Sequence, residues 1–298
     1  MRSDRKTTFI LILSFVIFGF TGITKHFVTA PTAFVSMLRA FGGGIALLLV
    51  TFFLRKKISF SAIKKNAIYL LAGGAALAVN WIMLFTAYEL AGVGMATILD
   101  YMAPIIVFFL APLIFKEKTT VLKFLIASAS LLGVVMVGGA FSGAIDVNGS
   151  GFLLGVVFGL VAAVTYAIFI ICNKKTAGIQ PFDKGIAQMF IAGTVMIPYV
   201  LLKELPEIAS YEWSFSAVLL ILFFIFIQTG AAYGCYFYAI GDVPAQKNAI
   251  LSFIDPAVTL LTAFLFLHES MDFMQAIGAA VILLSAAVVE IVPDRKPH

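Results

Sequence analysis

The sequence predicts an all-α integral membrane protein in which ten transmembrane helices form two inverted five-helix repeats. The first observation is composition: 62% of the 298 residues are hydrophobic and 12% are charged, whereas water-soluble proteins are about 45–50% apolar. A membrane-spanning helix needs about 20 apolar residues, so ten spans would use about 200 residues and leave only short connections. This excludes a folded soluble module such as the nucleotide-binding domain of an ATP-driven pump. The long unbroken apolar runs also exclude the alternating strands of a porin.

Ten apolar segments are the second observation, and their order defines the expected helices. They lie at residues 8–24, 32–54, 66–88, 94–115, 123–141, 151–172, 185–202, 215–239, 249–267 and 274–291. The first segment follows Arg2 and Arg5 as a signal peptide would. Its removal would leave nine spans and an unpaired second half, so we expect it to remain as a span.

The basic residues are the third observation, because cytoplasmic loops of membrane proteins are enriched in Lys and Arg. Sorting the loops by alternate sides places only Lys25 and Lys203 on one side. The other side holds seventeen: Arg2, Arg5, Lys6, Arg55, Lys56, Lys57, Lys64, Lys65, Lys116, Lys118, Lys123, Lys174, Lys175, Lys184, Lys247, Arg295 and Lys296. We therefore expect both termini in the cytoplasm. The net charge of +5 indicates topology and not nucleic-acid binding.

The two halves of the chain are similar at an offset of 152 residues. Residues 85–117 align with 237–269 without a gap, and eight of the 33 positions are identical. Among these identities a proline lies within each span and a glutamate at each end: Pro104 and Pro256, Glu117 and Glu269. Chance matches of Leu, Ile and Ala are common in so apolar a chain, but this spacing of proline and glutamate indicates a duplication.

The duplication divides the chain into residues 1–145 and 146–298, each a five-helix unit. Because five is odd, the second unit must enter the membrane from the opposite side. Inverted repeats of this kind supply two related conformations of one fold, and a site near the membrane midplane is then exposed alternately to either side. This symmetry favours a transporter over an enzyme.

At this point the sequence resembles a known family. A fourth span that reads ATILDYMAPIIVFFLAPLIFKEK and a ninth that reads AILSFIDPAVTLLTAFLFLHES are similar to the EamA-type branch of the drug/metabolite transporter superfamily. The resemblance covers nearly the whole chain. It implies a secondary transporter, often an exporter, of small metabolites such as amino acids, with a central cavity lined mainly by helices 3, 4, 8 and 9. Asp100 departs from the pattern, because members commonly carry an uncharged polar residue there.

Three ionisable residues lie deep within the expected spans, where each is a functional candidate because burying a charge in a bilayer costs at least about 2.5–3.5 kcal/mol. Arg39 and Asp100 lie at similar depths, about 10 and 9 Å from the same face. We expect them to form an ion pair, which either changes between conformations or permanently fixes packing. Asp255 has no basic partner at its depth, so it is a candidate for proton coupling, for binding a cationic substrate or for a bond to backbone.

Pro104 and Pro256 remove the hydrogen bonds that the carbonyls of Asp100 and Ser252 would accept. In a bilayer these carbonyls must find partners or line a cavity. We therefore expect helices 4 and 9 to be kinked there, either as hinges or only as a feature of packing.

Polar and aromatic side chains on the central helices complete the predicted substrate site. They could stack on an apolar or aromatic substrate, although ordinary packing is the favoured explanation for any single one of them. The predicted substrate-binding set is Asn80, Trp81, Asp100, Tyr101, Gln228, Tyr233, Tyr236 and Ser252. The predicted coupling or gating set is Arg39, Asp100, Asp255, Glu117 and Glu269.

Several broader expectations follow. Glycines four residues apart at Gly155 and Gly159, and at Gly230 and Gly234, permit close helix approach, and packing within the chain is favoured over a dimer. We expect a monomer that binds lipid and a small-molecule substrate, with protons as a further partner and with no cofactor, metal or catalytic residues. The leading interpretation is a secondary transporter in the cytoplasmic membrane. The alternatives are a lipid-carrier flippase and a membrane-embedded enzyme.

Overall fold

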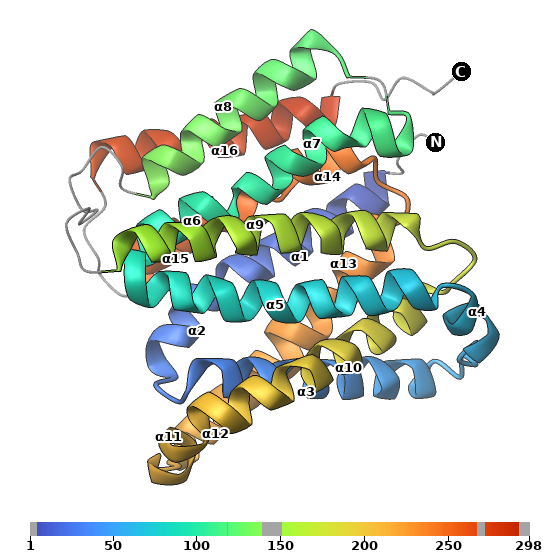
Figure 1. The fold of residues 1–298 in the computed structure, drawn as a ribbon. Helices are drawn as coiled ribbons and strands as arrows, with labels where there is room; N and C mark the ends of the chain where they lie inside the picture. The colour runs from blue at the N-terminus through green and yellow to red at the C-terminus, as the bar shows by residue number, and fades with distance from the viewer. Residues whose placement is uncertain (1–4, 118, 139–150, 267–271, 292–298) are drawn as a thin grey trace.

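A computed structural model describes residues 5–117, 119–138, 151–266 and 272–291, and in these ranges helices are the only regular secondary structure (Figure 1). Glu269, one of the predicted gating residues, lies outside them. The elements are α1 (Arg5–Gly19), α2 (Thr21–Phe27), α3 (Thr32–Phe53), α4 (Phe60–Lys65), α5 (Ala67–Ala91), α6 (Val93–Asp100), α7 (Met102–Phe115), α8 (Val121–Val137), α9 (Phe152–Lys175), α10 (Pro181–Tyr199), η1 (Val200–Glu204), α11 (Leu205–Ser210), α12 (Phe215–Phe223), η2 (Phe224–Ala231), α13 (Ala232–Ile240), α14 (Ala245–Leu251), α15 (Ile254–Phe266) and α16 (Phe273–Ile291).

Seven helical segments within the described residues are long and apolar enough to cross a membrane. They are Thr32–Phe53, Ala67–Ala91, Met95–Phe115, Phe152–Lys175, Pro181–Ser210, Phe215–Ile240 and Ala245–Phe266. Two shorter apolar helices, Val121–Val137 and Phe273–Val289, match the fifth and tenth predicted spans. The first predicted span is present as α1 followed by α2. The protein is therefore an all-helical, multi-pass membrane protein.

Two spans differ from the sequence prediction. The first is interrupted at Phe20, and the seventh continues through η1 and α11 to Ser210, eight residues beyond the predicted end at 202. The π turn η1 directly precedes Pro206 at the start of α11. A proline ring clashes with the carbonyl four residues earlier in a regular α-helix, and the wider π turn accommodates it.

The fourth and ninth spans are interrupted at equivalent positions. The fourth consists of α6 and α7, with a turn at Tyr101 between them, and the ninth consists of α14 and α15, with a turn at residues 252–253. At the offset of 152 residues, the starts of α6 and α14 coincide, as do the starts of α7 and α15. Pro104 and Pro256 are each the third residue after the break. The predicted interruptions are therefore present.

The helices pack across the boundary between the two sequence halves. The central helix α9, from the second half, packs along α5 and also contacts α6 and α7 from the first half. In the same way, α1 packs against α13, α14 and α15. Two further pairs, α3 with α10 and α8 with α16, join the halves at the periphery (Figure 1). The bundle is therefore interleaved, and the first helix of each half belongs spatially to the other half.

The predicted small-residue contacts lie within the chain. A Cβ atom added at Gly155 would lie 2.7 Å from the Cβ of Ala91, and one added at Gly159 would lie 2.8 Å from a side-chain carbon of Leu99. Both glycines of this pair therefore allow α9 to approach α5 and α6 closely. The pair Gly230 and Gly234 similarly faces Ala46 and Leu47 on α3.

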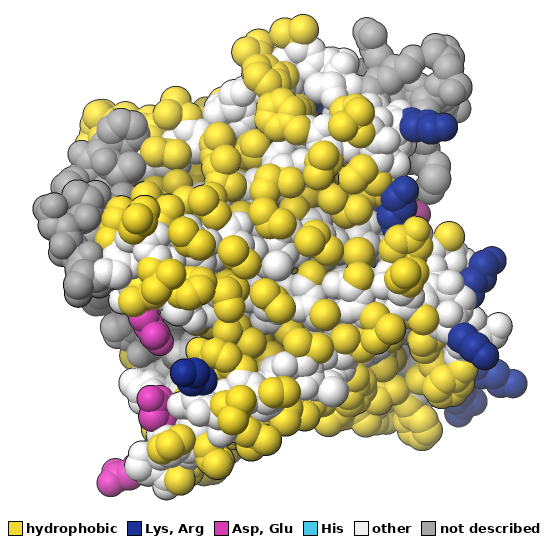
Figure 2. Space-filling model, viewed as in Figure 1, with side chains coloured by type: hydrophobic (Ala, Val, Ile, Leu, Met, Phe, Trp, Pro, Cys, Tyr) yellow, Lys and Arg dark blue, Asp and Glu magenta, His cyan; other side chains and the backbone are white. Residues whose placement is uncertain are grey.

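The two ends of the bundle differ in the charge of their exposed side chains. At one end, which we call the basic end, α1 begins and α3, α7 and α9 finish, and Figure 2 shows most of the visible Lys and Arg there, with a broad hydrophobic surface beyond them. The described basic residues at this end include Lys56, Lys57, Lys64, Lys65, Lys174 and Lys175. We call the opposite end the acidic end. Its described acidic residues are Glu89, Glu204, Glu207, Glu212 and Asp272.

Candidate functional site

Asp100 and Asp255 lie close to each other near the middle of the bundle. Asp100 is the last residue of α6 and Asp255 is the second residue of α15, so each carboxylate lies beside the break in its span. They are near enough to interact electrostatically, and Tyr101 lies beside Asp255. Both residues are half-buried. The two breaks therefore bring one carboxylate from each half to a shared site.

Asn80 fixes the position of Asp100. Its side-chain amide nitrogen donates a hydrogen bond to Asp100 Oδ1 at 2.8 Å and a second to the carbonyl oxygen of Ala162 at 3.0 Å. Asn80 is 3% exposed. Because it holds Asp100 against α9 as well as α5, a movement of α9 would also move this carboxylate.

Aromatic side chains cluster near the carboxylates. The Tyr166 ring stacks on Phe169 at 5.8 Å, and Phe169 stacks on Tyr236 at 5.9 Å, each with an interplanar angle of 12°. The centroid of the Tyr233 ring lies 6.1 Å from that of the Trp81 ring and 4.7 Å from that of the Phe18 ring. The predicted residues Trp81, Tyr233 and Tyr236 thus belong to one cluster, which joins α1, α5, α9 and α13.

Arg39 does not pair with Asp100 in this structure, so the predicted ion pair is wrong for this conformation. Its Nε donates to Thr229 Oγ1 at 3.1 Å, and its guanidinium carbon lies 3.9 Å from the centroid of the Phe224 ring and 5.0 Å from that of Trp81. Arg39 lies on α3, which packs against α10 and η2, whereas Asp100 lies against α5 and α9. The two residues therefore contact different helices of the bundle.

Glu117 joins the two halves at the basic end. Its carboxylate accepts hydrogen bonds from the backbone N–H groups of Ala245 at 2.7 Å and Gln246 at 3.0 Å, the first two residues of α14. A carboxylate at a helix N-terminus satisfies otherwise unpaired N–H groups and interacts favourably with the helix dipole. Nearby, Lys174 Nζ donates to the carbonyl oxygen of Val243. This end of the bundle is thus closed by contacts between α7, α9 and α14.

Two predicted site residues bond elsewhere. Gln228 donates from Nε2 to Thr24 Oγ1 at 2.7 Å, and Ser252, in the turn after α14, donates to the carbonyl oxygen of Ala249 at 2.8 Å. No group of three or more His, Cys, Asp or Glu side chains that could hold a metal ion occurs in the described part of the chain.

The comparison with protein families decides the identity of this fold. The model of the EamA-like transporter family matches twice, over residues 5–139 and 153–291. The chain belongs to the EamA-like transporter family. The two matches begin and end close to the bounds of the two predicted repeats.

Two bacterial proteins align with most of the chain. The uncharacterized transporter YxxF of Bacillus subtilis is 23% identical over 297 residues, which cover 96% of this chain and 90% of YxxF. Protein PecM of Dickeya dadantii is 24% identical over 226 residues, which cover 73% of this chain and 71% of PecM. A crystal structure of another protein superposes with a TM-score of 0.83 over 98% of this chain and 99% of that one, at 16% identity, and so shows the same fold.

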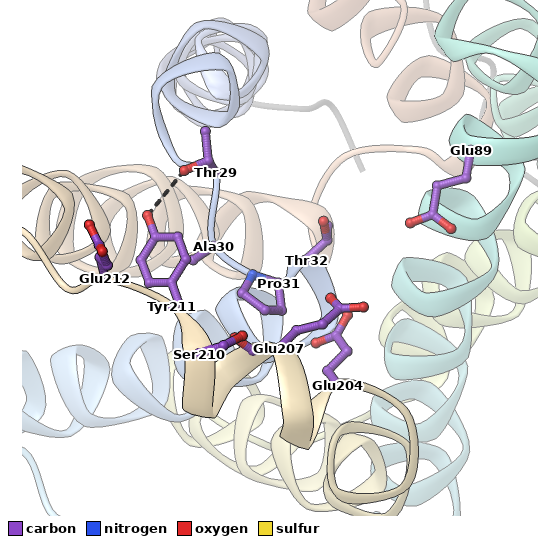
Figure 3. Close-up of a pocket in the computed structure, with 10 residues that line it drawn as sticks. All are labelled: Thr29, Ala30, Pro31, Thr32, Glu89, Glu204, Glu207, Ser210, Tyr211 and Glu212. Atoms are coloured by element: carbon purple, nitrogen blue, oxygen red, sulfur yellow. Dashed lines mark hydrogen bonds between the residues drawn. The ribbon is translucent and has the colours of Figure 1, made fainter.

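This EamA-like transporter has a pocket of about 380 Å³ at its acidic end, which none of the predicted site residues line. Figure 3 shows Glu89 pointing from α5 across the pocket toward Thr32 and Glu204. The carboxylate of Glu204 accepts from the backbone N–H groups of Ala33 at 2.9 Å and Phe34 at 2.6 Å. Glu204 therefore does for α3 at the acidic end what Glu117 does for α14 at the basic end.

Sequence reasoning did not select three residues that the structure brings into these contacts: Glu204 at the pocket, Tyr166 near the two carboxylates and Asn248, which is buried beside Tyr236. Glu204 lies in a segment that hydropathy assigns to a loop, so its cross-half contact had no signal. Tyr166 lies next to Thr165 in the middle of the sixth span, and this polar pair in an apolar run could have indicated it. Asn248 lies at the start of the ninth span, where a polar residue is ordinarily interpreted as the end of a loop.

Proposed function

We propose that this EamA-like transporter carries a small organic solute, an amino acid or a related metabolite, by alternating access. The observation that carries the proposal is the meeting of Asp100 and Asp255 at equivalent breaks in two helices, one from each half. Broken helices at a repeat interface are the usual location of a transporter's binding site. The proposal includes the two inverted repeats, 1–145 and 146–298.

The carboxylates supply the chemistry. Two carboxylates that face each other away from bulk water repel, and a proton or the ammonium group of a solute between them relieves that repulsion. Tyr101 and the rings of Tyr166 and Trp81 offer surfaces for an apolar or aromatic part of the solute. These features support an amino-acid-like cargo and coupling to protons. The proposed direction, export, follows from the family resemblance alone.

The ends of the bundle support one conformation of the cycle. Asp100 and Asp255 retain accessible surface, whereas Tyr236 and Asn248, on the basic-end side, are at most 1% exposed. The Glu117 contact closes that side. We infer a state that is closed at the basic end. Rearrangement of α14 and α9 would open the basic end, with Pro104 and Pro256 beside the hinges. Glu269 is proposed as a second gating residue.

Substitution of the carboxylates tests this function. In proteoliposomes with a panel of radiolabelled amino acids and organic cations, Asp100→Asn and Asp255→Asn should each lower flux driven by a pH gradient at least tenfold, because a neutral amide cannot carry the proton. The matched control is Glu207→Gln at the exposed acidic end. Unchanged gradient-driven flux in both aspartate variants would refute the coupling assignment.

The proposed location is the cytoplasmic membrane, with both termini and the basic end in the cytoplasm. The exposed residues Lys57 and Glu212 lie at opposite ends of the bundle and test this orientation in a chain whose two native cysteines are replaced. A cysteine at 212 should react with a membrane-impermeant maleimide in intact cells, and one at 57 should react only in inside-out vesicles. The reverse pattern would invert the topology.

A further inference from the structure

Tyr236 and Asn248 are buried polar residues whose side-chain groups have no hydrogen-bond partner among the described residues. Tyr236 Oη, Asn248 Nδ2 and Asn248 Oδ1 are all unpartnered, and each residue is 1% exposed. The Tyr236 hydroxyl and the Asn248 side chain lie close enough to interact with each other, although no bond between them has full hydrogen-bond geometry. Buried polar groups are bonded in the great majority of cases, so a neighbouring pair that leaves three such atoms unbonded needs a specific explanation.

Backbone hydrogen bonding does not account for the unbonded side-chain atoms of Asn248. Its N–H donates to the carbonyl of Pro244 at 2.9 Å and its carbonyl accepts from the N–H of Ser252 at 2.9 Å. The helix α14 is therefore complete here, and only the side chain has unused donors and acceptors. An aliphatic side chain of the same size would fill this position without that cost.

A continuous column of rings connects the pair to the carboxylates. Tyr236 stacks on Phe169 and Phe169 stacks on Tyr166, and the Tyr166 hydroxyl lies in the electrostatic field of Asp100 and Asp255. Asn248 is the fourth residue of α14, and Asp255 follows seven residues later along the same span. The pair therefore lies between the central carboxylates and the basic end.

The contacts that close the basic end are next to the pair. Glu117 holds the N–H groups of Ala245 and Gln246, less than one turn before Asn248. The Lys174 bond to Val243 lies immediately before them in the chain. Separation of these contacts would uncover Asn248 and Tyr236 before it reached the carboxylates.

We propose that Tyr236 and Asn248 form a second binding position for the transported solute, opened from the basic end, which takes a neutral hydrogen-bonding group such as an amide or a hydroxyl. The inference rests on the proposed transport function. Both side chains are neutral, and each both donates and accepts. Rings of Phe15, Phe169 and Phe237 surround the Tyr236 hydroxyl-bearing ring, so the position favours a neutral group over an ion. In this structure both side chains are buried.

Cysteine accessibility tests the position without knowledge of the cargo. In a chain carrying Cys172→Ala and Cys235→Ala, Asn248→Cys should react from the basic-end face with a charged methanethiosulfonate reagent at least tenfold faster than Ala279→Cys. Ala279 is an equally suitable buried control, 3% exposed in a separate core cluster on α16. Equal, slow reaction of both cysteines would overturn the proposal. If Asn248→Cys fails to fold, Tyr236→Cys provides the same readout.

Two apolar variants distinguish a binding position from a packing defect. Tyr236→Phe and Asn248→Leu should each raise the melting temperature by about 2–4 °C, because an unbonded buried group is removed. They should also raise the KM for solute loaded at the basic end about tenfold. Tyr238→Phe is the control, since Tyr238 lies on the same helix and is 44% exposed. Raised stability with unchanged KM would refute the binding role.

The transport panel and the cysteine labelling together distinguish failure of this inference from failure of the proposed cargo. If no amino acid or organic cation in the panel is transported, the cargo assignment fails, and the labelling rate of Asn248→Cys still decides whether the position opens. If amino acids are transported and the labelling rate equals that of Ala279→Cys, the second position fails alone.

Discussion

The guanidinium group of Arg39 lies deep in the bundle, where aromatic rings and a hydroxyl group contact it. It is 5% exposed, and its contacts with the Phe224 and Trp81 rings and with Thr229 Oγ1 replace the carboxylate that the sequence suggested. A planar guanidinium stacks on rings and is less strongly hydrated than an ammonium group. Depth along a helix can be counted from sequence, but the lateral position around the bundle cannot, and this is why the predicted partner was wrong.

Asn80 and Asp100 should behave as one unit at the residue scale. Because Asn80 orients Asp100 with a 2.8 Å hydrogen bond, either Asn80→Ala or Asp100→Ala removes the same interaction. The double variant should therefore lose less flux and less stability than the sum of the single losses, with a coupling of about 0.5–3 kcal/mol. Thermal unfolding and vesicle flux of the four proteins measure it. Strict additivity would show that Asn80 acts only through Ala162.

Helix interruptions show what local sequence rules can and cannot reach at the element scale. Pro104 and Pro256 indicated the breaks in the fourth and ninth spans, because a missing N–H and a steric clash are local effects. The π turn η2 had no such signal. In it, Thr229 Oγ1 donates to the carbonyl of Phe224, five residues earlier, while it accepts from Arg39. That geometry depends on a partner 190 residues away in the chain, so only the folded bundle specifies it.

The crossing of α8 and α16 gives a prediction for elements. A Cβ atom added at Gly278 would lie 2.7 Å from the Gly133 carbonyl oxygen and 2.7 Å from the Met136 Cβ. Because one of these atoms belongs to backbone, Gly278→Ala should destabilise the protein by about 1–3 kcal/mol through overpacking. Gly241→Ala is the matched control, since its Cβ would meet nothing within 4 Å. Equal melting temperatures for both variants would contradict this packing.

The arrangement of the whole molecule goes beyond what the repeat in the sequence describes. The offset of 152 residues correctly relates α6 to α14 and α7 to α15, because all four lie within the aligned residues 85–117 and 237–269. It does not indicate that α1 packs against α13 and α15 while α9 packs against α5 and α6. The residues that make those contacts, such as Gly155 against Ala91 and Phe18 against Tyr233, do not identify their partner helix in the sequence. We infer that the bodies that move in transport are interleaved sets of helices and not residues 1–145 against 146–298.

Glu117 and Glu204 make this inference testable, because each carboxylate caps a helix of the other half at opposite ends of the bundle. Hydrogen bonds to a charged group contribute about 1.5–3 kcal/mol each, so a neutral side chain at either position should favour opening of its own end. Glu117→Gln should speed amide hydrogen exchange at Ala245 and Gln246 at least tenfold and leave Ala33 and Phe34 unchanged. Glu204→Gln should do the reverse. Exchange that rises at both ends in either variant would indicate general destabilisation and would count against two independent closures.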